Sequence, residues 1–229
     1  MVGRVIDALE KNGLLENTLI FFTSDNGCSY PVANGEKLEK EYGHYASAQF
    51  RGSKSDIWEG GHRVPFIVSW ANNIEANSKN KKLICLTNLI ATCAEITNQT
   101  LPKNAGEDAQ SILPLLLKEN TATEHDVVVH HSIQGKFSIR KGKWKMNLCP
   151  GSGGWSSPND KKARELNLPE IQLYNIKKDE SEKKNVYKRK PDVVKELTAA
   201  LEKIVANGYT FSGKETKNDV PVDVFKKSK

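Results

Sequence analysis

The sequence has no long apolar run and no closely spaced pair of cysteines. Its longest apolar segments, such as Val64–Trp70 and Ile112–Leu117, are far shorter than the roughly 20 residues that a membrane-spanning helix needs. The four cysteines form no C-x-x-C motif and have no histidine at the spacing of a zinc ligand. The sequence therefore predicts no membrane span and no structural zinc site.

Aromatic residues make up 7% of the chain and do not accompany its basic segments. The net charge is +6, and lysines gather in residues 177–190 and 226–229, where they alternate with acidic residues or run to the C-terminus. A surface that binds nucleic acid would combine such charge with aromatic side chains spaced to stack on bases. We therefore interpret these segments as solvated surface and expect no nucleic-acid partner.

The first half of the chain alternates between helix and strand patterns. The apolar residues of a first helix share one face: Val2, Val5, Ile6 and Leu9. Gly13 ends this helix, an apolar strand follows at Thr18–Thr23, and the polar residues 27–49 predict a long loop. The continuous apolar strand Val64–Trp70 fits a sheet covered on both faces by helices. Because a helix opens the chain with no strand before it, we expect the sequence to begin inside this α/β domain.

The second half changes to helices followed by antiparallel strand patterns. Periodicity predicts three helices, at Lys82–Ile96, Ser111–Lys118 and Pro191–Gly208. Alternation predicts a strand, a hairpin turning at Gly142, and a further strand: Val127–His131, Lys136–Leu148 and Ile171–Asn175. We therefore expect residues 1–120 to form part of an α/β domain and residues 121–229 to form a smaller antiparallel α+β subdomain.

Asp25-Asn26 ends the strand Thr18–Thr23 and has two interpretations. In a parallel α/β sheet, ligands bind beyond the carboxyl ends of the strands, and a carboxylate and an amide oxygen are hard donors suited to Ca²⁺ or Mg²⁺. Alternatively, the pair forms a turn in which Gly27 takes a positive φ. The ten residues around the pair favour the turn when they are taken alone.

Two glycine-containing stretches could also carry chemistry. In Arg51-Gly52-Ser53-Lys54, the glycine allows a close approach of the backbone to an anion and the lysine supplies a compact positive charge. A solvent-facing loop explains the same residues. The paired glycines of residues 58–65 predict a strained turn that holds Glu59 close to Arg63, which we interpret as an architectural contact.

The five histidines divide into two groups. His44 lies in the polar loop, where it could donate a hydrogen bond to a substrate oxygen, and His62 could be a general acid, a ligand or a structural group. His125, His130 and His131 lie beyond residue 120. Because neighbouring residues of a strand point to opposite faces, His130 and His131 cannot both be ligands of one site, and we assign no catalytic role to these three.

Five segments, taken in order, resemble the formylglycine-dependent sulfatases of the alkaline-phosphatase-like superfamily, arylsulfatase-type members in particular. The segments are NTLIFFTSDNG, GHYASAQFRGSKSDIWEGGHRVPFIVSW, AGEDAQSILPLL, HHSIQGKFSIRKGKWKMNLCPGSGGW and QLYNIKKDESEKKNV. The resemblance extends from residue 1 to about residue 205. It implies a partial α/β/α sandwich of the alkaline-phosphatase type, followed by the family's small antiparallel α+β subdomain.

The resemblance also implies roles for four residues. Asp25 and Asn26 would bind the divalent cation of the family, Ca²⁺, and Lys54 would contact the sulfate ester and stabilise the charge on its oxygens. His44 falls in a loop that often borders the substrate pocket. The implied substrate is a sulfated small molecule or glycan, and a bacterial member would be periplasmic or secreted.

The family's nucleophile is a hydrated formylglycine made from the Cys or Ser of a C/S-x-P-x-R motif, and these 229 residues do not contain that motif. Two oxygen ligands are also fewer than the six to eight that Ca²⁺ takes. We therefore expect the chain to correspond to the C-terminal portion of a sulfatase and to be inactive by itself. A phosphate mono- or diester hydrolase of the same superfamily and a non-catalytic binding module are the alternatives.

Overall fold

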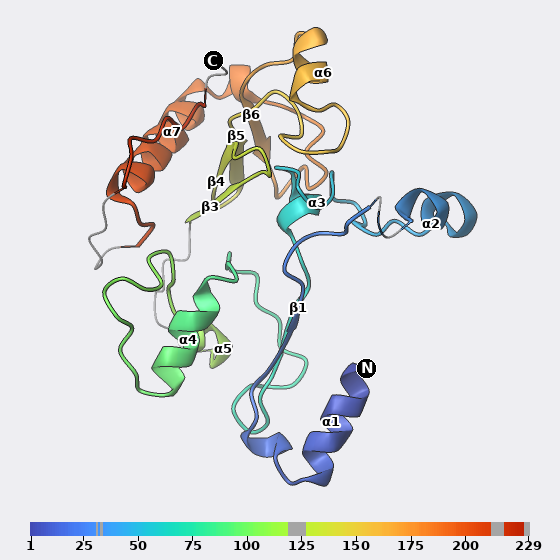
Figure 1. Cartoon of the computed structure of the whole chain (residues 1–229), viewed down its shortest axis with the longest axis vertical. Coiled ribbons are helices and arrows are strands. Elements are labelled where there is room, and N and C mark those ends of the chain that lie inside the picture. The colour runs from blue at the N-terminus through green and yellow to red at the C-terminus, as the bar shows by residue number, and fades with distance from the viewer. Residues whose placement is uncertain (31, 33, 119–126, 212–217, 227–229) are drawn as a thin grey trace.

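The computed structural model describes residues 1–229 except 31, 33, 119–126, 212–217 and 227–229 (Figure 1). The predicted boundary near residue 120 and His125 therefore lie outside the described residues. The elements of the first part are α1 (Val2–Lys11), the 3₁₀ turn η1 (Leu15–Asn17), β1 (Ile20–Thr23), α2 (Gly35–Tyr42), α3 (Glu59–His62), β2 (Phe66–Ser69), α4 (Asn88–Ile96) and α5 (Leu113–Leu116).

The later elements form a four-stranded sheet and its covering helix. They are β3 (Val127–His131), β4 (Phe137–Lys141), β5 (Trp144–Asn147), α6 (Asp160–Glu165), β6 (Gln172–Asn175), the 3₁₀ turn η2 (Tyr187–Arg189) and α7 (Pro191–Asn207). Mixed helices and sheets of this kind agree with the expected partial alkaline-phosphatase-like fold with a small C-terminal subdomain. None of the described helices is both long and apolar enough to cross a membrane.

β1 and β2 pair with each other in antiparallel register, from Ile20 opposite Ser69 to Thr23 opposite Phe66. The expectation that Asp25 follows a strand of a parallel sheet is therefore not met for this pair. The end of β1 lies beside the start of β2, so residues 24–26 come close to the segment that precedes Phe66. The continuous apolar sequence of β2 predicts a strand buried on both faces. In the described chain, β2 instead alternates between half-buried and exposed residues.

The polar stretch 27–49 contains α2, which corrects the prediction of a continuous loop. Asn34 precedes the helix with φ of 56°, and Gly43 ends it with φ of 62°. The helix has no long apolar face, and the ion pair between Lys40 and Glu36 joins positions four residues apart, as isolated helices favour. Periodicity of apolar residues could not reveal a helix stabilised in this way.

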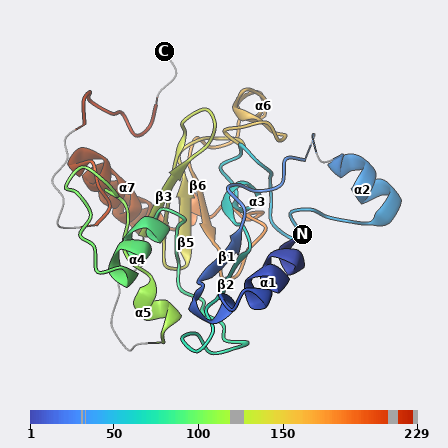
Figure 2. The ribbon, with the colours of Figure 1, turned by 60° about the horizontal axis from the view of Figure 1, so that its bottom comes forward.

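The sheet β3–β4–β5–β6 is antiparallel throughout, with its strands in sequence order. Gly142 has φ of 54° at the turn between β4 and β5, which confirms the predicted hairpin. The apolar face of α7 packs against this sheet (Figures 1 and 2). The buried residues of this core come from the sheet and the residue that follows β5, from α7, and from the C-terminal segment: Ile139, Met146, Leu148, Leu173, Leu197, Leu201 and Val224.

Candidate functional site

Asp25 and Asn26 lie directly beyond the end of β1. The Asp25 side chain is exposed, and the Asn26 amide nitrogen donates a hydrogen bond of 3.0 Å to the carbonyl oxygen of Gly27. The Ser24 hydroxyl donates to the carbonyl oxygen of Asn26 at 2.9 Å and fixes the turn. Because the Asn26 amide nitrogen is bound to the backbone, the amide oxygen points the other way and remains the donor atom suited to a hard cation.

Gly27 holds the Asp25-Asn26 turn against α3. Its N–H donates to the carbonyl oxygen of Gly61 at 3.0 Å, and a Cβ added at Gly27 would lie 1.8 Å from the carbonyl oxygen of Gly60. Gly27 is not among the residues with positive φ, so the prediction that the turn needs glycine for a positive φ was wrong. The residue must be glycine because two backbone segments meet here, not because of its own dihedral angles.

Lys54 lies next to this turn. Its N–H donates a hydrogen bond of 2.9 Å to the carbonyl oxygen of Cys28, two residues after Asn26, and its side chain is half-exposed. Gly52 and Ser55 on either side have φ of 81° and 82°. The structure therefore brings Lys54 close to the turn that carries Asp25 and Asn26, although the sequence separates them by nearly thirty residues.

His44 is not brought to this turn by any hydrogen bond of the described residues. It follows α2, which projects to one side of α3 (Figure 1), and its side chain is exposed. Its N–H donates to the carbonyl oxygen of Leu38 at 3.1 Å, which ties it to the end of α2. The role expected for His44 at a substrate pocket stays a prediction.

The Asp56 side chain holds in place the loop that carries Lys54. Its side chain is fully buried, and it accepts hydrogen bonds from the N–H groups of Ser53 at 2.8 Å, Trp155 at 2.9 Å and Ser156 at 3.0 Å, and from the Ser156 hydroxyl. A buried carboxylate with several donors is strongly held. Sequence reasoning missed Asp56 because the donors at Trp155 and Ser156 lie about a hundred residues further along the chain.

A buried ionic cluster, made of Glu59, Lys145, Glu182 and Arg140, joins α3 to the four-stranded sheet. Lys145 Nζ lies 3.1 Å from a carboxylate oxygen of Glu59 and 3.1 Å from one of Glu182. Arg140 lies 3.1 Å from the other oxygen of Glu59. The backbone N–H of Glu59 also donates to Glu182 at 2.6 Å.

The charges of this cluster move the pKa values of its two carboxyl groups in opposite directions. Burial would raise the pKa of Glu59, but Lys145, Arg140 and Arg63 outweigh it and hold the pKa below its ordinary value. Burial dominates at Glu182 and raises its pKa, despite Lys145. The expected proximity of Glu59 and Arg63 is confirmed at 3.6 Å, and their architectural role extends to the whole cluster.

The ring of His62, the last residue of α3, lies against the ring of His130, with 4.0 Å between the ring centroids and a tilt of 44°. His130 Nε2 lies 3.2 Å from the carbonyl oxygen of Ile57. Burial, followed by the neighbouring His62, lowers the pKa of His130 well below its ordinary value. The two rings therefore pack as neutral groups at neutral pH, and this contact gives His130 a structural role that the sequence did not reveal.

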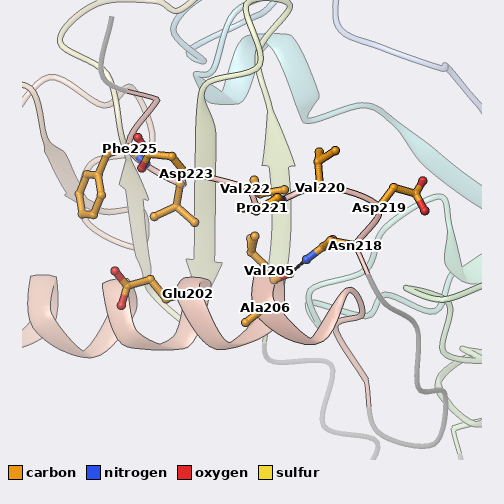
Figure 3. Close-up of a pocket in the computed structure, with 11 residues that line it drawn as sticks. Glu202, Val205, Ala206, Asn218, Asp219, Val220, Pro221, Val222, Asp223 and Phe225 are labelled. Carbon is orange, nitrogen blue, oxygen red and sulfur yellow. Dashed lines mark hydrogen bonds between the residues drawn. The ribbon is translucent and has the colours of Figure 1, made fainter. Parts of the chain in front are cut away.

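A cavity of about 610 Å³ lies elsewhere in the molecule, between α7 and residues 218–225 (Figure 3). It is lined by Val205 and Ala206 of α7 and by Val220, Pro221 and Val222 of the facing segment, and by none of the candidate site residues. The cavity therefore does not belong to the site at the end of β1.

The donor set at Asp25 and Asn26 fits part of a calcium site. Both supply oxygen atoms, which Ca²⁺ prefers, but Ca²⁺ takes six to eight of them. The described residues contain no cluster of three or more His, Cys, Asp or Glu side chains that could hold a metal ion. Lys54 is half-exposed and lies in the loop that the buried Asp56 holds, and its role as an anion ligand stays a prediction.

Residues 1–99 match the family model described as Sulfatase. The chain is 34% identical over 215 residues to an N-acetylgalactosamine-6-O-sulfatase of Bacteroides thetaiotaomicron, covering 89% of this chain and 39% of that protein. It is 38% identical over 147 residues to an arylsulfatase of Hemicentrotus pulcherrimus, covering 64% of this chain and 25% of that protein. The chain thus spans less than half the length of these curated relatives.

A solved structure from work on the metabolism of multiple glycosaminoglycans by Bacteroides thetaiotaomicron has a similar fold. It matches with a TM-score of 0.74 and 32% identity, over 89% of this chain and 42% of that one. A sulfatase from Pseudoalteromonas sp. matches with a TM-score of 0.69 and 25% identity, over 89% of this chain and 40% of that one. Because each match covers 89% of this chain, each includes residues both before and after residue 126.

Proposed function

Because the chain belongs to the sulfatase family of the alkaline-phosphatase-like superfamily, we propose that it supplies part of the active site of a sulfuric ester hydrolase. The observation that carries the proposal is the hydrogen bond from Lys54 N–H to the Cys28 carbonyl oxygen. It joins the loop of a candidate sulfate-binding lysine to the turn of two candidate metal ligands. Neither segment alone distinguishes a site from a surface turn.

Asp25 and Asn26 would hold Ca²⁺ through their side-chain oxygens, together with ligands from outside this chain. The bound cation would supply positive charge to the sulfate group. Lys54 would contact a sulfate oxygen and stabilise the negative charge that develops there as the ester bond breaks. The backbone contacts of Gly27 and the buried Asp56 would keep these groups in place without rearrangement during the reaction.

The family nucleophile, a hydrated formylglycine, would come from a C/S-x-P-x-R motif, which these 229 residues lack. We therefore propose that the chain alone turns over no sulfate ester. The relative that is 34% identical is named for N-acetylgalactosamine 6-sulfate. A sulfated amino sugar, free or within a glycan, is accordingly the substrate class that we propose.

Turnover by an N-terminally extended protein tests this function. The chain would be expressed behind a nucleophile-bearing segment of the family, with its cysteine converted to formylglycine, and assayed on N-acetylgalactosamine 6-sulfate, 4-nitrophenyl sulfate and 4-nitrophenyl phosphate. We expect both sulfate esters to be hydrolysed in preference to the phosphate. Preference for the phosphate would support the phosphoesterase alternative, and no turnover of a panel of sulfate esters would overturn the proposal.

Two variants assign the roles within that protein. Lys54→Ala should lower kcat/KM for sulfate esters about 100-fold, the usual size for loss of one group that stabilises transition-state charge. Lys161→Ala, which removes an exposed lysine of α6, is the matched control and should leave kcat/KM within about twofold. Asp25→Ala should weaken Ca²⁺ binding in isothermal titration calorimetry, because it removes one of the few oxygen ligands.

A further inference from the structure

Two large apolar side chains are exposed on the loops that pack against the loop of Lys54. Ile133 is 58% exposed and Trp155 is 55% exposed. Single exposed apolar residues are common, but an exposed patch beside a polar site is typical of a ligand-binding surface. Tryptophan is also enriched among the residues that contribute most of the binding energy at protein–protein interfaces.

Hydrogen bonds from the backbone N–H groups of both residues reach Ser55 and Asp56, which directly follow Lys54. The N–H of Ile133 donates to the carbonyl oxygen of Ser55 at 3.0 Å, and the N–H of Trp155 donates to a carboxylate oxygen of Asp56 at 2.9 Å. Each residue is therefore one hydrogen bond away from the two residues that directly follow Lys54. The two loops are therefore attached to the loop that carries Lys54, although they belong to the C-terminal part of the chain.

These loops are also held rigidly. A Cβ added at Gly154 would lie 2.6 Å from the carbonyl oxygen of Ser55 and 2.6 Å from a carboxylate oxygen of Asp56, so the backbones are in direct contact. The N–H of Gln134 donates to the carbonyl oxygen of Gly153 at 3.4 Å and joins the two loops. A binding surface fixed in this way loses little conformational entropy when a ligand binds.

We propose that Trp155 and Ile133 form an apolar platform on which a sugar ring of the sulfated substrate packs while its sulfate group reaches Lys54. The proposal rests on the proposed function and adds the residues that would select a sugar over a simple aryl ester. The C–H groups on one face of a sugar ring are apolar and suit the face of an indole ring, whereas its hydroxyl groups remain at the edge and reach solvent.

Binding to the full 229-residue chain tests the platform separately from turnover. The two ligands are a disaccharide that carries N-acetylgalactosamine 6-sulfate and the same disaccharide without sulfate, titrated by NMR. Trp155→Ala should raise the Kd of both ligands about tenfold, which corresponds to about 1.4 kcal/mol. Trp155→Phe should restore most of the affinity, since an aromatic face remains. Leu166→Ala, at a similarly exposed apolar residue after α6, is the matched control.

Lys54→Ala separates the two proposals, because it should weaken only the sulfated ligand. Equal binding of both ligands by the wild-type chain, with loss of both in Trp155→Ala, would count against the sulfate-binding role and support the platform. Preference for the sulfated ligand, unaltered in Trp155→Ala, would overturn the platform and keep the function. Absence of binding to both ligands would also overturn the platform.

The extended enzyme provides a second measurement. The ratio of kcat/KM for the sulfated disaccharide to kcat/KM for 4-nitrophenyl sulfate should fall at least fivefold in Trp155→Ala, mainly through KM. If Trp155→Ala instead lowers thermal stability and leaves this ratio as it was, the indole packs against another part of the protein and the platform is wrong.

Discussion

The β3–β6 sheet with α7 and the β1–β2 pair differ in how far they bury their apolar side chains. Leu173 of β6 and Leu201 of α7 are fully buried, whereas Phe22 of β1 is 43% exposed and Ile67 of β2 is 59% exposed. The candidate site residues nevertheless belong to the less buried region. Its geometry depends on the better packed one, because Asp56 and Glu59 receive most of their partners from residues after 126.

Lys145→Met breaks the connection between these regions at its most buried point and should have the largest effect on stability. Glu59 and Glu182 would stay buried without their shared cation, which costs about 3–5 kcal/mol of unfolding free energy. Urea denaturation followed by circular dichroism measures this loss. Lys161→Met, at an exposed lysine, should change stability by less than about 0.5 kcal/mol. A Lys145→Met variant as stable as wild type would mean that the two regions are joined by other contacts.

Leu201→Ala and Ile67→Ala compare the two regions directly. We expect Leu201→Ala to cost about 3 kcal/mol, since it leaves a cavity in a closed core. Ile67→Ala should cost less than about 1 kcal/mol, because much of this side chain is already in contact with water. Both values come from urea denaturation of the two variants. Equal losses would contradict the difference in packing between the regions.

Gly27→Ala tests the contact between the Asp25-Asn26 turn and α3. The added Cβ would overlap the carbonyl oxygen of Gly60, so one backbone must move, at a cost of about 1–3 kcal/mol. Thermal denaturation and calcium titration should both show a loss. Gly3→Ala is the control, because no atom lies within 4 Å of its added Cβ and alanine favours helix α1. Unaltered calcium affinity in Gly27→Ala would mean that calcium binding does not depend on the geometry of this turn.

The contact between the His62 and His130 rings predicts a dependence of stability on pH. The pKa of His130 is lowered in the folded chain by burial, so below pH 6.5 the unfolded chain binds a proton that the folded chain does not. The free energy of unfolding should then fall as the pH decreases, by at most about 1.4 kcal/mol per pH unit for this residue. His130→Gln should reduce that slope between pH 6.5 and pH 5, measured by denaturation at each pH, whereas exposed His131→Gln controls for the substitution. An identical slope in His130→Gln would show that the pH dependence of stability does not come from His130.

The sequence predicted the elements whose pattern is local. The β4–β5 hairpin turns at Gly142, and α7 begins at Pro191 and ends before Gly208, as expected. The sequence missed α2, because polar side chains and not an apolar stripe stabilise that helix, and it missed α6. It also led to a parallel sheet for Asp25, since the direction of pairing between β1 and β2 depends on partners more than forty residues apart.

Residue types and their order alone determined the family resemblance and the candidates Asp25, Asn26 and Lys54, because oxygen donors and a lysine have fixed chemical preferences. Tertiary structure decided which of them meet. It placed the loop of Lys54 beside the Asp25-Asn26 turn. It also brought the backbone of Gly60 so close to Gly27 that only glycine fits there, and it surrounded Asp56 with hydrogen-bond donors. These contacts join residues far apart in the chain, and only folding brings their donors and acceptors within hydrogen-bonding distance.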